Sequence, residues 1–234
     1  MLGWPGEAVT LDLDHERFAY AGKFVMSRTG KAVVREDDGI LGAVAFDADR
    51  TDESVCRLRY VTVRAGRRGE GIGSRLLAFV RARVVAAGEY EAVEIAVNNP
   101  FAYDAAYRAG FGYTGRETGI AELVLAWPRP PEDPDRSDVP DDTSGRIEDR
   151  SAVPEDTSGR IDDGSDVPEN RSERPQDRSS GPGGESRGGD ERSGAGYRAG
   201  LEIYAARSLS PPERAFVEDA LKRGPPDPVA VPGQ

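Results

Sequence analysis

Six short stretches of this chain are rich in β-branched, aromatic and other apolar residues, which is the pattern of strands in a folded sheet. The first two are residues 31–35 and 40–46, and Asp37-Asp38-Gly39 between them predicts a hairpin turn. The other four are residues 55–63, 92–97, 113–116 and 120–126. We expect the last two to form a second hairpin.

Two helices are predicted between these strands. From Ile72 to Val84 apolar residues recur every four positions, and Gly88 follows as a helix stop. A shorter helix is predicted over residues 101–108, after Pro100. The order is three strands, helix, strand, helix and two strands. It indicates an α/β (α+β) fold with a mixed, mostly antiparallel sheet flanked by helices.

A glycine-rich turn joins the third strand to the first helix. Gly69, Gly71 and Gly73 stand at or just before the helix start, where backbone N–H groups and the helix dipole favour an anion. Three arginines surround the turn: Arg67, Arg68 and Arg75. This combination predicts a site for a phosphate-bearing ligand.

The spacing excludes two common phosphate loops. No lysine follows the glycines, as a Walker loop requires, and Gly73 comes one residue early for a dinucleotide fingerprint. The pattern that fits is R-x-x-G-x-G, with Arg68, Gly71 and Gly73. Following a strand and opening a long helix, it resembles the GNAT N-acetyltransferase superfamily. The resemblance covers residues 31–127, where a strand, an asparagine, a tyrosine-bearing helix and a Gly-Phe pair follow in the family's order.

The resemblance implies acetyl-CoA as co-substrate, and we expect no metal because no metal-ligand spacing is present. The pyrophosphate would lie on the glycine turn, and the pantetheine arm along the main chain of the preceding strand. The cofactor-binding residues implied are Val61, Val63, Arg68, Gly69, Gly71, Ile72, Gly73, Ser74 and Asn99.

The resemblance also implies direct attack of a neutral amine on the thioester, with a tyrosine hydroxyl protonating the thiolate. Tyr107 is the candidate acid and Tyr103 the second candidate. The family's tyrosine lies four residues before the glycine of Gly-Phe, and Ala106 occupies that place here. The alternative is that both tyrosines pack their helix on the sheet.

No general base is assigned from the sequence. Asp52 and Glu53 precede the third strand, from which either would act through water. Glu94 and Glu122 lie on predicted strands, where we expect solvent-facing ion pairs. His15, the one histidine, is expected on the surface of a helix near the N-terminus.

The second half of the chain differs in composition. Residues 1–129 contain 17 basic and 18 acidic side chains, whereas residues 130–234 contain 14 and 24. A repeat of fourteen residues starts at Arg136 and again at Arg150, and each copy offers only a valine and an isoleucine for burial. Such burial does not offset the ordering of the backbone, which costs about 1–2 kcal/mol per residue. Disorder is therefore predicted.

Four segments follow from this reading: a GNAT-like domain (1–128), a disordered acidic linker (129–194), a helical hairpin (195–224) and a flexible tail (225–234). In the hairpin, Tyr197, Leu201 and Tyr204 share one helical face. Ser210 and Glu213 have the spacing of a capping box. Two short helices need a partner in water, either the domain or a second subunit of a homodimer.

Arginine outnumbers lysine by 28 to 3, and the net charge is −11. This composition resembles proteins of salt-loving archaea, and a GC-rich bacterial protein with an acidic tail is the alternative. The acidity argues against a nucleic-acid partner. No signal peptide or membrane span is visible, so we expect a cytoplasmic protein. Cys56 is alone, which excludes a disulfide within the chain.

The sequence favours an N-acetyltransferase that moves an acetyl group from acetyl-CoA to a primary amine. The acceptor, a small molecule or a peptide, is undefined because the segment before the first strand is short. The alternative is a non-catalytic GNAT-fold module that binds acyl-CoA as a sensor or scaffold. A third interpretation makes the acidic tail the working part and the domain its anchor.

Overall fold

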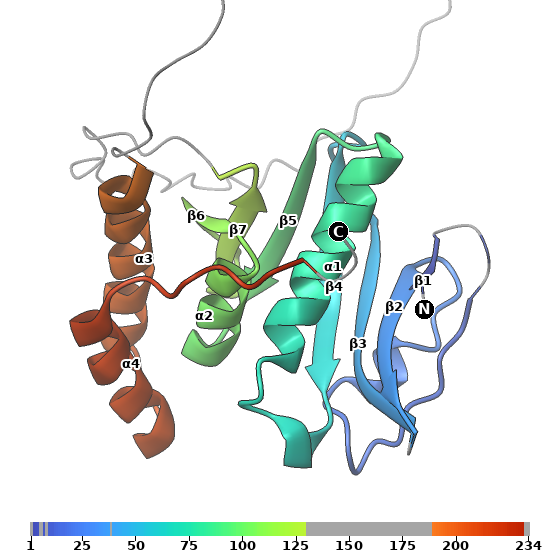
Figure 1. The fold of residues 1–234 in the computed structure, drawn as a ribbon, viewed down its shortest axis with the longest axis horizontal. Helices are drawn as coiled ribbons and strands as arrows, with labels where there is room; N and C mark the ends of the chain where they lie inside the picture. Colours follow the sequence, from blue (N-terminus) through green and yellow to red (C-terminus); the bar gives the residue numbers. More distant parts are fainter. Residues whose placement is uncertain (1, 5–6, 8, 38, 130–188, 232–234) are drawn as a thin grey trace, which may run out of the picture. The chain divides into compact units, whose positions relative to one another are not determined.

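One sheet organises the part of the chain that the computed structural model describes, residues 2–4, 7, 9–37, 39–129 and 189–231 (Figure 1). Seven strands pair in the order β1-β2-β3-β4-β5-β7-β6. All neighbours are antiparallel except β4 and β5, which are parallel. The strands are β1 (Leu2–Gly3), β2 (Gly30–Glu36), β3 (Gly39–Ala48), β4 (Val55–Val63), β5 (Ala92–Val97), β6 (Gly112–Glu117) and β7 (Leu123–Trp127). The predicted fold class is confirmed, and β1 is the strand that the sequence did not reveal.

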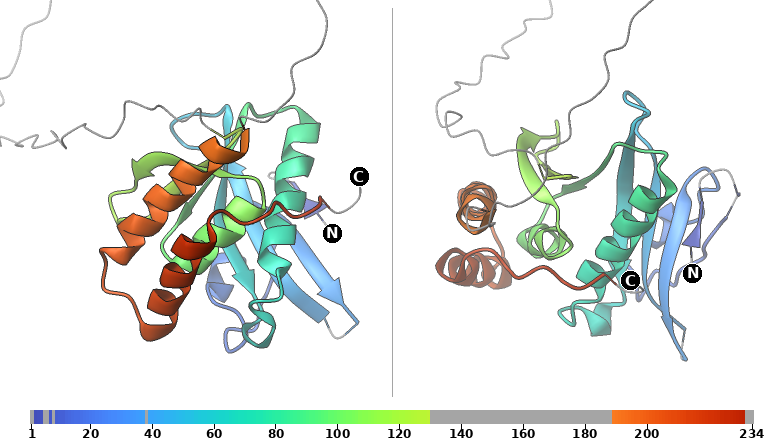
Figure 2. Two further views of the ribbon diagram at one scale, coloured as in Figure 1. Left: turned by 60° about the vertical axis from the view of Figure 1, so that its left-hand side comes forward. Right: turned by 45° about the horizontal axis from the view of Figure 1, so that its top comes forward.

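Two helices cover one face of this sheet (Figure 2). Helix α1 (Ile72–Ala87) connects β4 to β5, and α2 (Pro100–Arg108) follows β5. The apolar stripe of α1 is the side that packs on the sheet, since its members are at most 4% exposed: Leu76, Leu77, Val80 and Val84. These residues join the main core with side chains of β3, β4, β5 and β7.

The N-terminal segment covers the other face over β2 and β3. Phe18 and Phe24 are buried there in a second, smaller core. The helix expected in this segment is absent, because residues 15–20 form turns and only the short 3-10 helix η1 (Ala21–Lys23) follows. Tyr20 explains the interruption: its φ of 60° is left-handed, which a right-handed helix does not accommodate.

A C-terminal helical pair packs on α2 and β6. Helix α3 (Gly189–Ala205) begins six residues before the predicted start of the hairpin, and α4 (Pro211–Arg223) follows it. The predicted apolar face of α3 is buried, with Tyr197, Leu201 and Tyr204 at most 1% exposed. At the start of α4, the Ser210 N–H donates to the Glu213 carboxylate at 2.9 Å, as a capping box requires. Most of the predicted linker, residues 130–188, lies outside the described residues.

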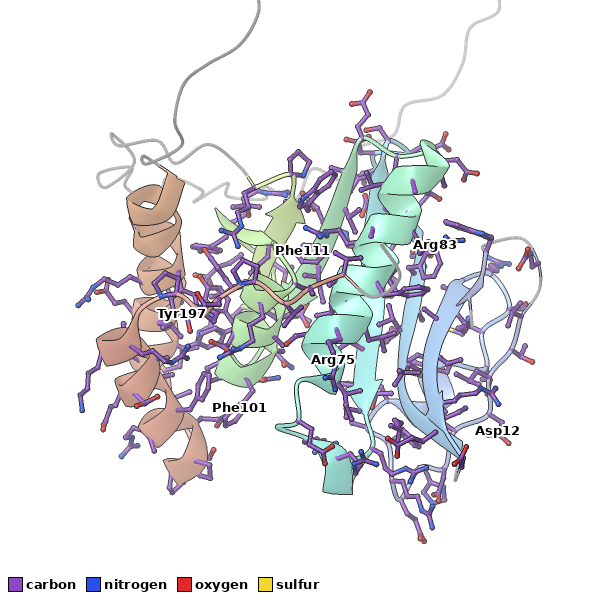
Figure 3. All side chains as sticks on the ribbon, in the orientation of Figure 1. Asp12, Arg75, Arg83, Phe101, Phe111 and Tyr197 are labelled. Atoms are coloured by element: carbon purple, nitrogen blue, oxygen red, sulfur yellow. The ribbon has the colours of Figure 1, made fainter. Side chains whose placement is uncertain are left out.

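Polar contacts fix the helical pair to α2. The Tyr103 hydroxyl donates to the Gly196 carbonyl at 2.9 Å, and the Tyr197 hydroxyl donates to the Asp104 carboxylate at 2.6 Å. Arg223 of α4 reaches the same carboxylate at 3.1 Å. Asp104 is 6% exposed, so these partners satisfy a buried charge. Figure 3 shows Tyr197 pointing from α3 toward α2.

The segment after α4 crosses α2 toward α1 (Figures 1 and 2). The Val229 N–H donates to the Arg108 carbonyl at 2.7 Å, and the side chains of Val229 and Val231 pack on the main core. Residues 225–231 are thus held against the domain, in contrast to the flexible tail that we expected. Pro226 is also buried, and the valines supply the apolar surface that the composition of this short segment concealed.

The close approach of α3 to α2 makes Gly200 a test of this packing. A Cβ on Gly200 would lie 2.0 Å from the Tyr103 hydroxyl, whereas one on Gly194 of the same helix meets nothing within 4 Å. We expect Gly200→Ala to lower the free energy of unfolding by about 2–3 kcal/mol through overpacking. Gly194→Ala should leave it unchanged or raise it by up to about 1 kcal/mol. Urea unfolding measures both, and equal stabilities of the two variants would contradict the docked arrangement.

Candidate acyl-CoA site

β4 and β5 separate part-way along the sheet. Their parallel register runs from the Val55–Ala92 pair to the Leu58–Ile95 pair and then stops. β4 continues to Val63, paired on its other edge with β3. The carboxyl end of β4 therefore has no strand on its β5 side, and its main-chain groups on that edge face the gap.

A β-bulge lies at the point of separation. The register between β3 and β4 shifts after the Phe46–Leu58 pair, so Arg59 is the extra residue. A bulge bends its strand and increases the local twist. It also reverses the alternation of side chains: Leu58 packs in the main core before the bulge, and Val61, three residues later, packs on it again.

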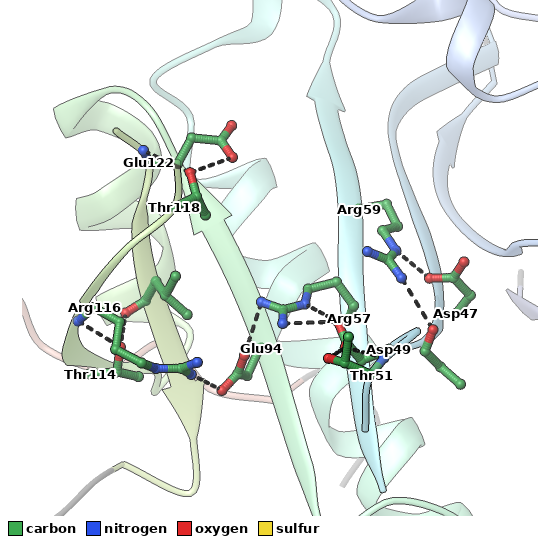
Figure 4. Close-up of polar contacts among 12 residues, drawn as sticks. Asp47, Asp49, Thr51, Arg57, Arg59, Glu94, Thr114, Arg116, Thr118 and Glu122 are labelled. Carbon is green, nitrogen blue, oxygen red and sulfur yellow. Dashed lines mark hydrogen bonds and ion pairs between the residues drawn. The ribbon is translucent and has the colours of Figure 1, made fainter. Parts of the chain in front are cut away.

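A chain of charges ties the strands together before they separate (Figure 4). Arg57 of β4 contacts Glu94 of β5 at 2.9 Å and Asp49, just beyond β3, at 2.9 Å. Arg116 of β6 reaches Glu94 from the other side. The side chains of Arg57, Asp49 and Glu94 are only 20%, 10% and 11% exposed, so water screens these pairs weakly.

Hydrogen bonds from Thr51 stabilise the ionised form of Asp49 in this cluster. Its hydroxyl and its N–H donate to Asp49 at 2.7 and 3.0 Å. These two bonds, followed by Arg57, hold the pKa of Asp49 well below its usual range. Asp49 is therefore an ionised structural residue at neutral pH.

A cleft lies between the separated strands and encloses about 540 Å³, part of it open to solvent. Tyr60 and Val61 line it from β4, and residues 95–99 line it from β5 and the loop that follows. Tyr20 of the N-terminal segment and Glu122 of the β6–β7 loop complete the wall. The sequence analysis expects Glu122 in a solvent-facing ion pair, so its place in the cleft wall is a correction.

The glycine turn lies at the end of β4, ahead of α1. Gly69 and Gly71 have φ values of +86° and +73°, which favour glycine, and a Cβ on either would meet nothing within 4 Å. Gly71 is the N-cap of α1 and has no side chain to cap it. The first intrahelical bond is donated by Arg75 to the Gly71 carbonyl at 3.1 Å, so the earlier N–H groups of the helix are free of intrahelical acceptors.

The three arginines of the turn differ in their partners. Arg67 is held by Glu36 at 2.7 Å and by Glu70 at 2.9 Å. Arg68 and Arg75 contact only backbone carbonyls, at 3.4 and 3.3 Å, and are exposed. Figure 3 shows Arg75 projecting from the first turn of α1. Among the described residues, the positive charge at the turn that no carboxylate neutralises is thus that of Arg68 and Arg75.

The remaining predicted cofactor residues lie around the turn and the cleft. Ile72 and Ser74 are buried on the first turn of α1, so main chain rather than side chain is what they present. A Cβ on Gly73 would contact Val63 at 3.6 Å, which shows how closely this turn approaches β4. Asn99 caps α2 by accepting the Ala102 N–H at 2.9 Å and also lines the cleft.

Tyr107 and Tyr103 are not among the residues that line the cleft. Both are buried, at 2% and 0% exposure, in a group of rings that includes Tyr197. The Tyr107 hydroxyl accepts the Tyr113 N–H at 3.1 Å. The reason is helical geometry: one residue is a rotation of about 100°, so Tyr107 faces α3 rather than the direction of Ala106. Burial raises the pKa of Tyr103 well above its usual range.

The other candidate groups lie apart from the cleft. Asp52 and Glu53 precede β4, and about seven strand residues, on the order of 20 Å, separate them from Tyr60. Glu94 forms ion pairs, as expected, but its side chain is only 11% exposed and does not face solvent, which corrects that part of the expectation. Burial raises the pKa of Cys56 to about 12, so its thiol stays protonated. The described residues contain no group of side chains able to hold a metal ion and no helix able to cross a membrane.

Residues 4–111 match the model of the acetyltransferase (GNAT) family. Over these residues the chain is similar to the GNAT acetyltransferases. The edge of β4 and the glycine turn that opens α1 both lie within the matched residues. The family match begins earlier than the predicted resemblance and includes the segment between β1 and β2.

Several solved acetyltransferases are similar to this GNAT domain. Nourseothricin acetyltransferase has 22% identity and a TM-score of 0.36, with 42% of this chain and 64% of that chain covered. An N-acetyltransferase from Staphylococcus aureus Mu50 has 23% identity and a TM-score of 0.36, with 42% of this chain and 64% of that chain covered. PaiA N-acetyltransferase from Thermoplasma acidophilum, solved with coenzyme A, has 14% identity and a TM-score of 0.35. The match covers 41% of this chain and 58% of that chain. The chain spans less than two thirds of the length of these three. No curated protein sequence matches it.

Arg57 tests the charges that tie the strands together. Arg57→Met leaves Asp49 without a cation and Glu94 with only the more exposed Arg116, so we expect the free energy of unfolding at pH 7 to fall by about 2–3 kcal/mol. Arg116→Met is the control, because its side chain is 52% exposed and its loss should cost less than about 1 kcal/mol. Urea unfolding measures both variants.

The pH dependence of this loss has a definite sign. Because the folded pKa of Asp49 is lowered, its contribution is complete above an unfolded pKa of about 4 and is lost as pH falls toward the folded value. Without Arg57 the folded pKa rises, so stability should begin to fall at a higher pH than in the parent. Parallel pH profiles for parent and variant would contradict the assignment.

Proposed function

We propose that this protein is an N-acetyltransferase that transfers an acetyl group from acetyl-CoA to a primary amine. The observation that carries the proposal is the separation of β4 and β5 beyond the Leu58–Ile95 pair, next to a glycine turn that opens α1. A strand edge without a partner offers main-chain donors and acceptors to an extended ligand. The turn offers donors to an anion at one end of that edge.

The turn is proposed to bind the pyrophosphate. Gly69, Gly71 and Gly73 leave room for the anion, and the N–H groups of Ile72 and Ser74 point along the helix axis toward its start. Arg68 supplies charge that no carboxylate neutralises in the described structure. No side chain needs to move for this, since a Cβ position at Gly69 or Gly71 faces open space.

The edge of β4 is proposed to bind the pantetheine arm through the main chain of Val61 and Val63. Acetyl-CoA supplies an activated acyl group in the form of a thioester. A backbone N–H of this edge would stabilise the oxyanion formed when the amine attacks, because it is fixed by β3 on the other side. Asn99 borders the same cleft from the start of α2.

Protonation of the leaving thiolate by Tyr107 stays a prediction, and the burial of its hydroxyl under α3 argues against it. For Tyr107→Phe we expect an unchanged kcat and a loss of about 1 kcal/mol in the free energy of unfolding, because the Tyr113 N–H loses its acceptor. Thiol release and urea unfolding measure the two effects. A fall in kcat of tenfold or more, with unchanged acetyl-CoA affinity, would restore Tyr107 as the acid.

The absence of a tyrosine of α2 from the cleft wall favours a second candidate, a module that binds acyl-CoA without turnover. The two candidates separate on one measurement. Stoichiometric binding of acetyl-CoA with no thiol release across a panel of primary amines supports the binding module. Amine-dependent thiol release supports the enzyme.

Gly71 offers a direct test of the cofactor site, and Gly88 offers its control. The two glycines cap opposite ends of α1, have φ values of +73° and +72°, and both face open space. Alanine at either position therefore introduces the same strain of about 1–2 kcal/mol. We expect Gly71→Ala to weaken acetyl-CoA binding by about tenfold or more, because only this Cβ enters the anion site. Gly88→Ala should bind like the parent.

Isothermal titration calorimetry with acetyl-CoA measures all three proteins, and urea unfolding verifies that the two variants are equally destabilised. Equal affinities of the three proteins would remove the turn from the cofactor site. A parent that is folded but does not bind acetyl-CoA would overturn the proposed function as a whole.

A further inference from the structure

We infer that Glu122 binds the acceptor's ammonium group and takes its proton, and that the acceptor is a cationic amine with an apolar or aromatic body and no carboxylate. The inference rests on the proposed function and goes beyond it by naming a base and a class of acceptor. Glu122 lines the cleft from the β6–β7 loop, on the wall formed with Tyr60, Val61 and Asn98.

The charges around the cleft single out Glu122. Asp47 pairs with Arg59, and Asp49 and Glu94 pair with Arg57. Within the described residues no arginine or lysine forms an ion pair with Glu122. Its side-chain partner is the Thr118 hydroxyl, which donates at 3.4 Å (Figure 4). One carboxylate of the cleft wall thus keeps its charge available for a ligand.

Arg59 also lines the cleft, but its guanidinium group already forms an ion pair with Asp47. Its Nε donates to Asp47, and its Nη2 donates to the Ala48 carbonyl at 3.2 Å. Among the described residues that line the cleft, a carboxylate on the acceptor would find no unpaired cation, and Glu122 would repel it. Lys23, over the Tyr60 ring, is a nearby cation outside this lining. A primary amine, which enters as an ammonium ion, finds the opposite charge.

Two aromatic rings form the wall that faces the body of the acceptor. Tyr20 and Tyr60 both line the cleft, with ring centroids 6.0 Å apart. Tyr20 is 52% exposed and holds a left-handed φ of 60°, a strained conformation for a non-glycine residue. Strain that presents an exposed ring at the mouth of a cleft is typical of a binding surface. Lys23 lies over Tyr60, 5.9 Å from the centroid, and fixes that ring.

The transfer balances with Glu122 as base. The carboxylate takes one proton from the ammonium, directly or through one water, and later returns it to solvent. The nitrogen lone pair forms the C–N bond at the thioester carbonyl carbon, and the C–S bond breaks with its electron pair on sulfur. The second nitrogen proton passes to the thiolate. The products are the N-acetylated amine, free thiol and one proton released.

The titratable and charged groups around Glu122 are few. Glu117 lies on the same hairpin and pairs at 2.9 Å with Arg207, which follows the end of α3. Burial raises the pKa of Tyr204 of α3, and the carboxylates of Glu117 and Glu122 raise it further, so its hydroxyl stays neutral. Across the cleft stand Tyr20, Tyr60 and the Arg59–Asp47 pair. An acidic limb in the rate profile that depends on Glu122 is therefore separable from its neighbours by substitution.

The test uses the full chain with acetyl-CoA and two matched probes, 2-phenylethylamine and phenylalanine, which differ by one carboxylate. Thiol release gives kcat/KM across pH, and calorimetry gives the acetyl-CoA affinity. We expect transfer to 2-phenylethylamine at least tenfold faster than to phenylalanine. Glu122→Gln keeps an acceptor for Thr118 but cannot take a proton, so kcat/KM should fall by about 100-fold with unchanged acetyl-CoA affinity. Its acidic limb should disappear.

Two further variants complete the design. Glu122→Asp should restore part of the rate, which a structural role alone would not require. Glu117→Gln removes a carboxylate of the same hairpin whose side chain is 40% exposed and paired with Arg207, and it should behave like the parent.

Each outcome decides the inference. A Glu122→Gln variant with the parent's rate and pH profile overturns the role of Glu122 and leaves the proposed function standing. Equal transfer to both probes overturns the acceptor class. A parent that binds acetyl-CoA and transfers to neither probe also overturns it, whereas a parent that does not bind acetyl-CoA removes the proposed function beneath it.

Discussion

The limited pairing of β4 with β5 is the constraint on which the site depends. Four residue pairs and one buried ion pair, Arg57–Glu94, hold the two parallel strands together at one end. A bulge at Arg59 then bends β4 where the register stops. The strand survives this because β3 pairs with its other edge through Val63. The unpaired edge is thus a stable feature of the fold, and its polar groups call for a ligand or for water.

The C-terminal helical pair, α3 and α4, packs next to this site. It covers the side of α2 that carries Tyr103 and Tyr107, and it engages the Tyr103 hydroxyl through the Gly196 carbonyl. Tyr204 reaches further and donates to the Val97 carbonyl at 2.8 Å, next to the cleft wall. Through this hydrogen bond, α3 holds the carboxyl end of β5 in place. The same packing buries the side chains of both candidate acids, which argues against either one as the proton donor of the proposed reaction.

The amino-acid pattern predicted the parts of this fold that rest on local periodicity. The stripe of α1, the buried face of α3 and the capping box at Ser210 all follow from spacing along one helix. What it missed depends on contacts between distant segments. Tyr20 reaches the cleft because of a left-handed backbone conformation, which its neighbours in sequence do not signal. Glu122 lines the cleft because β7 begins only at Leu123, so the residue belongs to a loop rather than to a strand.

The ion-pair partners explain part of the arginine-rich composition. Arg57, Arg59 and Arg67 are each held by carboxylates. These three arginines are therefore part of the structural ion pairs, whereas other charges at the site have no ion-pair partner among the described residues. Arg68 and Arg75 leave positive charge at the glycine turn, and Glu122 leaves negative charge in the cleft. A polyanionic donor would meet positive charge at the glycine turn, and a cationic acceptor would meet negative charge in the cleft. Because like charges repel over these distances, the same separation would keep either ligand from occupying the other's place.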